Sequence, residues 1–104
     1  MFGFFSTVPS ISVNMLQEKL KDKINLLDVR TPDEYRLGHI AKAKNVPLNM
    51  LDGYKGSSTE ELYVICQSGM RSKKAAKILQ KKGYNVVNVR GGMSQWTGQI
   101  RGGK

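Results

Sequence analysis

Residues 61–72 read ELYVICQSGMRS, an apolar run that enters a short polar loop and then a helical pattern. The run at 62–65 is typical of a buried strand, and the lysines and alanines that occupy opposite faces within 71–82 predict an amphipathic helix. A strand that ends in such a loop leaves its last side chain at a surface cleft. That side chain is Cys66, the single cysteine of the chain, which makes it a candidate nucleophile.

Strands and helices alternate along the rest of the chain. The clearest helix start is Thr31-Pro32-Asp33-Glu34, because Thr31 can cap, Pro32 suits the first helical position and Glu34 completes a capping box. Strands are predicted at 10–11, 24–29, 44–48, 61–66 and 84–89, with 24–29 a central strand. Helices are predicted at 13–22, 32–37, 71–82 and 93–96, and a loop that can hold one helical turn at 49–59. This order predicts an α/β domain with a largely parallel sheet, helices on both faces, and an active site beyond the carboxyl ends of the strands.

Composition limits the classes of function. The 104 residues suit one domain, and 17 Lys and Arg against 8 acids give a net charge of +9. Such a field attracts anions, and the absence of an aromatic-basic stacking platform favours small anionic substrates or acidic protein partners over nucleic acid. One cysteine allows no intramolecular disulfide, which predicts a reducing compartment, the cytoplasm by default.

The two ends of the chain are expected to lie outside the folded unit. Residues 1–9 contain all three phenylalanines, but the apolar run is too short to span a bilayer or to act as a secretion signal. We expect an N-terminal apolar arm at 1–9, a domain at 10–98 and a flexible tail at 99–104. No membrane span is predicted.

The loop after Cys66 can act as an anion cradle. Its successive N–H groups can point at the sulfur, with Gly69 permitting a backbone conformation closed to other residues and Arg71 adding a positive charge that can also hold an anionic substrate. A reference cysteine has a pKa of about 8.5, which helix N-termini and nearby cations lower to about 3.5–7.5. The alternative is that Cys66 is a small buried hydrophobic residue at the end of a strand.

Several motifs along the chain resemble those of the rhodanese superfamily of sulfurtransferases in its single-domain form. They are LDVR (27–30), EY (34–35), GHI (38–40), AKNVP (43–47), CQSGMRS (66–72) and RGGMSQW (90–96), and the resemblance spans residues 11–96. It implies a five-stranded, mostly parallel sheet flanked by helices, and a six-residue loop from Cys66 to Arg71 sized for a sulfane sulfur.

The resemblance also implies a two-step mechanism without a metal or organic cofactor. The Cys66 thiolate attacks the outer sulfur of thiosulfate, releases sulfite and holds the sulfur as a persulfide, which a thiol, of a small molecule or a protein, or cyanide then removes. Covalent catalysis and the stabilisation of both anions by loop N–H groups fit these steps. Cys66 is the predicted catalytic residue, and the predicted substrate-binding residues are Gln67, Ser68, Gly69, Met70, Arg71 and Ser72.

Other residues are predicted to support the site. Asp28 is expected to bind backbone N–H groups or to pair with an arginine, and Arg30 is expected to interact with Glu34 across the helix start. Gly91, with the glycine after it, is expected to make a tight turn near the Cys66 loop. His39 belongs to a structural turn in the resembling family and is not expected to act as a base. Trp96 is expected in the core.

Two other classes of function remain as alternatives. The first is a rhodanese-like binding or sulfur-delivery module without significant thiosulfate turnover. The second is a phosphatase or arsenate reductase that uses the same cradle. The length of the loop, one residue shorter than in related dual-specificity phosphatases, and the lack of a second cysteine argue against the second class.

Overall fold

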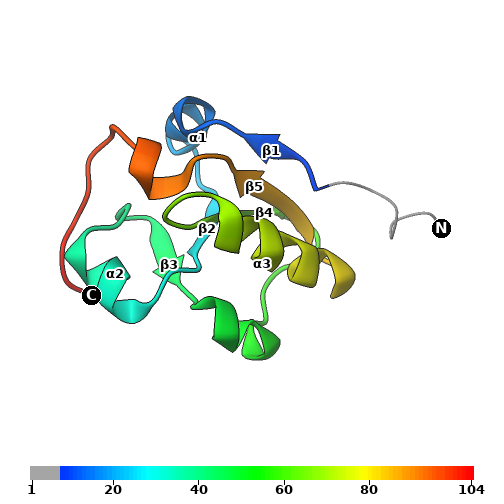
Figure 1. The fold of residues 1–104 in the computed structure, drawn as a ribbon. Coiled ribbons are helices and arrows are strands. Elements are labelled where there is room, and N and C mark those ends of the chain that lie inside the picture. Colours follow the sequence, from blue (N-terminus) through cyan, green and yellow to red (C-terminus); the bar gives the residue numbers. More distant parts are fainter. Residues whose placement is uncertain (1–7) are drawn as a thin grey trace.

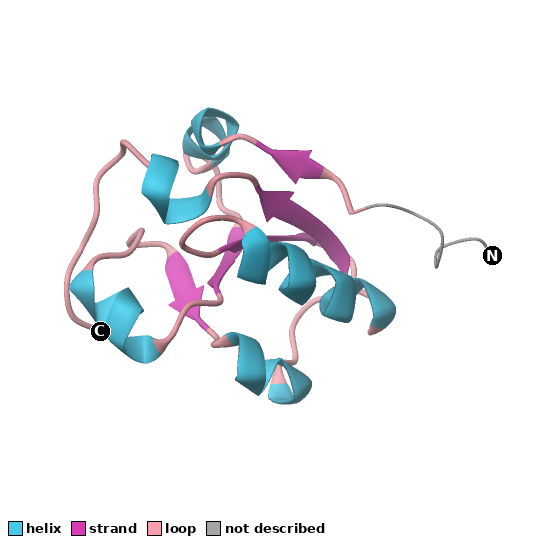
Figure 2. Cartoon of the chain, in the orientation of Figure 1, coloured by secondary structure: helices cyan, strands magenta, loops and turns pink. Residues whose placement is uncertain are grey.

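A five-stranded, all-parallel sheet forms the centre of the protein, in the order β1-β5-β4-β2-β3 (Figure 1). The computed structural model describes residues 8–104, so most of the predicted apolar arm, residues 1–7, lies outside the described residues. The strands are β1 (Ser10–Ile11), β2 (Asn25–Asp28), β3 (Ala43–Asn45), β4 (Glu61–Ile65) and β5 (Asn85–Val89). The helices are α1 (Val13–Lys19), α2 (Pro32–Leu37) and α3 (Met70–Lys81), with 3-10 helices η2 (Leu48–Gly53) and η3 (Gly92–Gln95) between strands or after the last one (Figure 2).

Local sequence signals place the ends of the helices. The hydroxyl of Thr31 accepts from the backbone N–H of Glu34, and the Glu34 carboxylate accepts from the N–H of Thr31, which completes the predicted capping box of α2. At the C-terminal end of α3, Gly83 has a φ of +99°, the left-handed conformation that commonly ends helices. The predicted starts of both helices are confirmed to within one residue.

Helices cover both faces of the sheet, as predicted. On one face, α3 and η2 bury Ala75, Ala76, Leu79 and Leu51 against β2, β4 and β5. On the other face, α1 buries Val13 and Leu16 against the opposite side chains of the same strands, and Tyr35, Met93 and Trp96 pack at its border. Burial of this apolar surface on both sides is the main source of stability for the central strands.

Some predicted boundaries differ from the structure. Strand β3 ends at Asn45, before the predicted end at residue 48, because Pro47 has no N–H to donate to a ladder. The helical turn expected within the loop at 49–59 is present as η2, which begins at Leu48, one residue before the predicted loop. Strand β2 lies in the interior of the sheet, between β4 and β3, so the prediction of a central strand is confirmed.

The predicted flexible tail is tied to the α2 region. Arg101 and His39 exchange backbone hydrogen bonds of 2.8 and 2.9 Å, and the N–H of Gly103 donates to the carbonyl of Arg36 at 2.8 Å. These long-range bonds lie beyond the reach of local sequence signals. They hold residues 101 to 103 against the segment that follows α2.

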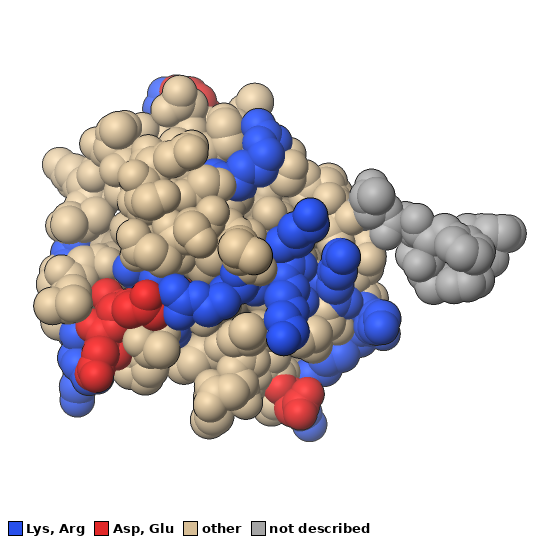
Figure 3. Space-filling view, in the orientation of Figure 1, with Lys and Arg blue, Asp and Glu red and all other residues tan. Residues whose placement is uncertain are grey.

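Positive charge is prominent on the face of the protein that carries α3. Lys and Arg side chains gather over the face that carries α3, with a smaller group of acids beside them (Figure 3). Among the helices of residues 8–104, none has the length and apolar character needed to cross a membrane.

Candidate active site

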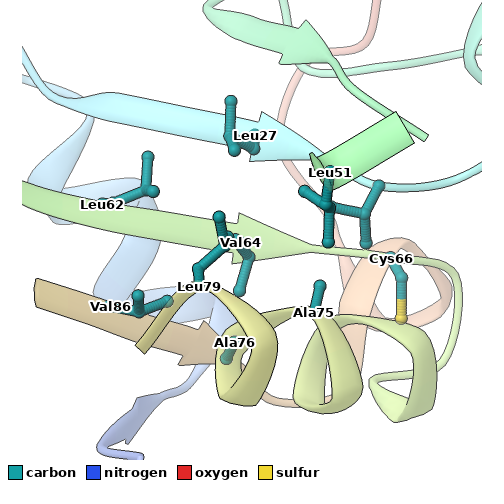
Figure 4. Packing of buried hydrophobic residues seen from close by; sticks show 10 residues of the cluster. Leu27, Leu51, Leu62, Val64, Cys66, Ala75, Ala76, Leu79 and Val86 are labelled. Carbon is teal, nitrogen blue, oxygen red and sulfur yellow. The ribbon is translucent and has the colours of Figure 1, made fainter. Parts of the chain in front are cut away.

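Cys66 follows β4 directly and lies at the carboxyl end of the sheet, beside the start of α3 (Figure 4). The residue is buried, with 1% of its surface exposed, and the thiol is free. Its Sγ accepts a hydrogen bond of 3.0 Å from the backbone N–H of Gly69. Sγ also lies 3.4 Å from the hydroxyl of Ser72, whose Oγ in turn donates to the carbonyl of Gly69 at 3.2 Å. The sulfur is therefore surrounded by polar groups of its own loop, unlike a cysteine that only fills a core.

These polar groups stabilise the thiolate. Burial raises the pKa of the Cys66 thiol, but the hydroxyl of Ser72 and the backbone N–H groups of Ser72, Gly69 and Ser68 outweigh it, so the net pKa lies below the ordinary value of a cysteine. Because Ser72 is in the first turn of α3, the N-terminus of this 12-residue helix contributes to the stabilisation. The arrangement favours a sulfur anion at this position.

Glycines hold the loop in shape. Gly69 has a φ of +100°, which a residue with a side chain rarely adopts. Gly92 has a φ of +59°, and a Cβ there would lie 2.3 Å from the carbonyl oxygen of Cys66. This close approach lets the N–H groups of Met93 and Ser94 donate to the carbonyls of residues 66 and 67, each at 2.8 Å. The turn at 91–92 thus contacts the Cys66 loop as predicted, and within this turn Gly92 makes the closest approach.

A buried ion pair lies beneath the loop. The guanidinium of Arg30 contacts both carboxylate oxygens of Asp28 at 2.7 to 3.1 Å, and the same carboxylate accepts from the backbone N–H of Arg30. Arg30 also donates to the carbonyl of Gly38 at 2.7 Å and to the side chain of Gln67 at 3.2 Å. The expected pairing of Asp28 with an arginine is therefore present, and Arg30 connects β2, the end of α2 and the Cys66 loop.

The expected contact between Arg30 and Glu34 is wrong. Arg30 is fully occupied by Asp28 and its other acceptors, whereas Glu34 pairs with Arg71 through two hydrogen bonds of 2.6 and 2.8 Å. The hydrogen bond from Arg71 is the main cause that lowers the pKa of Glu34 to about 2, and the same pair raises the pKa of Arg71. The positive charge of Arg71, expected to face an anionic substrate, is therefore already balanced. No local pattern could have shown this pair, because its members lie 37 residues apart.

The remaining candidates lie around this centre. Met70 is 79% exposed, and Gln67 and Ser68 are exposed at the mouth of the loop. His39 is buried, stacks on the ring of Tyr35 and is hydrogen-bonded through Nδ1 to the carbonyl of that residue at 2.7 Å. Those contacts are the ones expected of a structural histidine.

A pocket of about 310 Å³ adjoins the loop on the side of α2 and η3. Its lining includes Arg30, Glu34, Leu37, Gln67, Trp96 and Ile100. Trp96 packs against the core, as expected, and also borders this pocket. Within residues 8–104, no group of three or more His, Cys, Asp or Glu side chains is placed to hold a metal ion.

Comparisons with known proteins agree with this geometry. The sequence profile of the rhodanese-like domain matches residues 12–99. The chain is 36% identical to thiosulfate sulfurtransferase 18 of Arabidopsis thaliana, over 86% of this chain and 78% of that protein. It is 37% identical to YrkF of Bacillus subtilis (strain 168), and the match covers 90% of this chain but only 54% of that protein. The crystal structure of a rhodanese-like domain protein from Staphylococcus aureus superposes with a TM-score of 0.86 at 31% identity, covering 93% of this chain and all of that one.

Proposed function

This chain belongs to the rhodanese-like domain family, and its relatives include proteins named as sulfurtransferases. On this basis we propose that it carries sulfane sulfur from thiosulfate or a related persulfide donor to a thiol or cyanide through a persulfide on Cys66. The observation that carries this proposal is the set of donors aimed at Sγ: the N–H of Gly69 at 3.0 Å, supported by the N–H groups of Ser68 and Ser72. These fixed donors serve an anion at this position, and both the thiolate and the persulfide are anions.

The first step is a displacement at sulfur. The Cys66 thiolate attacks the outer sulfur of thiosulfate and forms a new S–S bond, while the old S–S bond breaks and its electron pair leaves with sulfite. No external oxidant or reductant is needed, because one S–S bond replaces another and the transferred sulfur keeps its oxidation state. Splitting the transfer into two displacements is the advantage of covalent catalysis.

The second step returns the enzyme to its starting state. An acceptor thiolate or cyanide attacks the outer sulfur of the persulfide, and Cys66 leaves as the thiolate. Ser72 suits both steps, because its hydroxyl can accept from the neutral thiol, as its 3.4 Å distance to Sγ indicates, or turn to donate to the anion. We also propose that this chemistry takes place in the cytoplasm, where a lone thiol stays reduced.

Two observations support the alternative of a sulfur-delivery module. Arg71, the expected anchor for a small anion, is paired with Glu34 on two hydrogen bonds, and Cys66 is 1% exposed. A persulfide donor that presents its outer sulfur on a longer carrier needs less help from Arg71 than a free thiosulfate dianion does. This alternative keeps Cys66 as the carrier and changes only the donor.

Steady-state kinetics separate the two versions. Wild type and Cys66→Ser are assayed for sulfite release from thiosulfate with a thiol or cyanide acceptor, and in parallel for sulfur transfer from a small persulfide donor. If the wild type turns over both donors and Cys66→Ser turns over neither, the thiosulfate reaction is supported. If the wild type turns over only the persulfide donor, sulfur delivery is supported. Equal rates for the wild type and Cys66→Ser with both donors would remove Cys66 from the mechanism.

A further inference from the structure

The exposed face of α3 carries lysines that the proposed chemistry does not use. Lys73, Lys74, Lys77 and Lys81 are all exposed, while Ala75, Ala76 and Leu79 of the same helix are buried. These four lysines are called the lysine face here, and they account for part of the positive surface over α3 in Figure 3.

The lysine face lacks compensating acids. The sequence of α3, MRSKKAAKILQK, contains no Asp or Glu, and among the ion pairs of residues 8–104 none includes one of the four lysines. Lys77 lies three positions after Lys74 and four positions from both Lys73 and Lys81. At these spacings, like charges on a helix destabilise the helix. The helix therefore carries a self-repulsion that binding of an acidic group would relieve.

The position of the lysine face connects it to the site. Helix α3 begins at Met70, directly after the Cys66 loop, and Met70 itself is 79% exposed. At a rise of about 1.5 Å per residue, Lys73 and Lys81 are separated by about 12 Å along the helix. That length exceeds a small anion and matches about four residues of extended peptide.

We propose that the lysine face docks an acidic segment of a protein that exchanges sulfur with Cys66. The inference rests on the proposed function and names the class of its partner: a protein with carboxylates next to its reactive thiol or persulfide. The charge of the lysine face complements such a segment, and the exposed Met70 between the lysines and the loop offers an apolar contact beside the reacting sulfur.

A protein fits this face better than a nucleic acid does. The lysine face includes no aromatic side chain for stacking on bases. The one arginine of α3, Arg71, is held by Glu34 in a pair that leaves its fork unavailable for a phosphate. Base stacking and bidentate phosphate contacts, which nucleic-acid-binding surfaces commonly use, are therefore lacking here.

The test uses two synthetic peptides of equal length, one with a cysteine beside a run of six Glu and one with Gln in place of Glu. Serine versions of both give the dissociation constant by fluorescence anisotropy, and the cysteine versions give kcat/KM as sulfur acceptors. The test variant joins Lys73→Gln, Lys74→Gln, Lys77→Gln and Lys81→Gln. The control variant has the same net charge and joins four exposed positions outside α3: Lys19→Gln, Lys23→Gln, Lys44→Gln and Lys55→Gln.

At low ionic strength, we expect the wild type and the control variant to prefer the Glu peptide at least tenfold in both measurements. The preference should fall with added salt and be lost in the test variant, while transfer to the Gln peptide is unchanged. Equal binding of the two peptides by the wild type, or an equal loss of the preference for the Glu peptide in both variants, would overturn the inference. In either case, sulfur transfer to the Gln peptide would still support the proposed function. Tighter binding of an RNA oligonucleotide than of the Glu peptide to the lysine face would also overturn it. Binding of the Glu peptide without sulfur transfer to either peptide would support the docking face and contradict the proposed function.

Discussion

Replacing Gly92 by alanine is expected to disrupt the contact that holds the Cys66 loop against the turn after β5. The new Cβ would lie 2.3 Å from the carbonyl oxygen of Cys66 and 2.8 Å from the carbonyl group of Gln67. All these neighbours are backbone atoms, so no flexible side chain can move away. The variant must either shift the loop or give up the hydrogen bonds that Met93 and Ser94 donate to it.

Two costs contribute to the expected magnitude. A residue with a side chain in the left-handed region loses about 1–2 kcal/mol relative to glycine. Insertion of a methyl group into a tightly packed place costs about 1–3 kcal/mol more. We therefore expect Gly92→Ala to lower the free energy of unfolding by about 2–5 kcal/mol, a large share of the 5–15 kcal/mol that is usual for a domain.

Gly83→Ala is the matched control. Gly83 also has a positive φ, +99°, but no atom lies within 4 Å of a Cβ built there. Only the backbone cost of about 1–2 kcal/mol applies to this variant. The difference between the two variants therefore isolates the close approach at Gly92.

Urea unfolding followed by the fluorescence of Trp96, the single tryptophan, measures both variants. Trp96 lies four residues after Gly92 and packs against the core, so its emission reports on loss of this region. Equal free energies of unfolding for Gly92→Ala and Gly83→Ala would refute the claim that Gly92 is required by packing against the loop.

Three further predictions concern the groups around Cys66. Asp28→Asn leaves the buried Arg30 without its counter-charge and is expected to lower the free energy of unfolding in urea by about 3–5 kcal/mol. Asp33→Asn, at an exposed pair, should lower it by less than about 1 kcal/mol. Similar losses in the two variants would contradict the role of the buried pair. Ser72→Ala removes a hydroxyl that can turn to donate to the thiolate, so it is expected to raise the pKa of Cys66 in a titration of thiolate absorbance; a pKa that stays or falls would exclude this role. The pKa of Glu34 is lowered from 4.5 to about 2, so its contribution to stability is present above pH 4.5 and lost as the pH falls through about 2. Glu34→Gln should therefore make unfolding less sensitive to acid over that range. An unchanged acid profile would count against the pair of Glu34 with Arg71.

Residues with local signals were the ones that the sequence predicted well. The capping box at Thr31 and Glu34, the glycine at the end of α3 and the apolar run before Cys66 each depend on neighbours a few positions away, and the structure contains all of them. The alternation of strands and helices predicted a largely parallel sheet, and the structure contains five strands that are all parallel.

Contacts between distant segments were the ones that sequence reasoning missed. Glu34 was assigned to Arg30, four residues away, but its carboxylate lies beside Arg71, which the fold brings from the start of α3. The tail at 99–104 has small and polar residues that suggest mobility, yet the backbone of Arg101 pairs with that of His39. Such partners are fixed by the packing of whole elements, for which a single sequence contains no local pattern.

The proposed function requires Cys66 to carry sulfur as a persulfide. It is tested most directly by incubating the protein with thiosulfate, or with a small persulfide donor, and measuring its intact mass before and after addition of a reductant. We expect the wild type to gain one sulfur atom, located on the peptide that contains Cys66. The reductant should reverse this gain, and Cys66→Ser should not show it. No gain with either donor, or the same gain in Cys66→Ser, would contradict it.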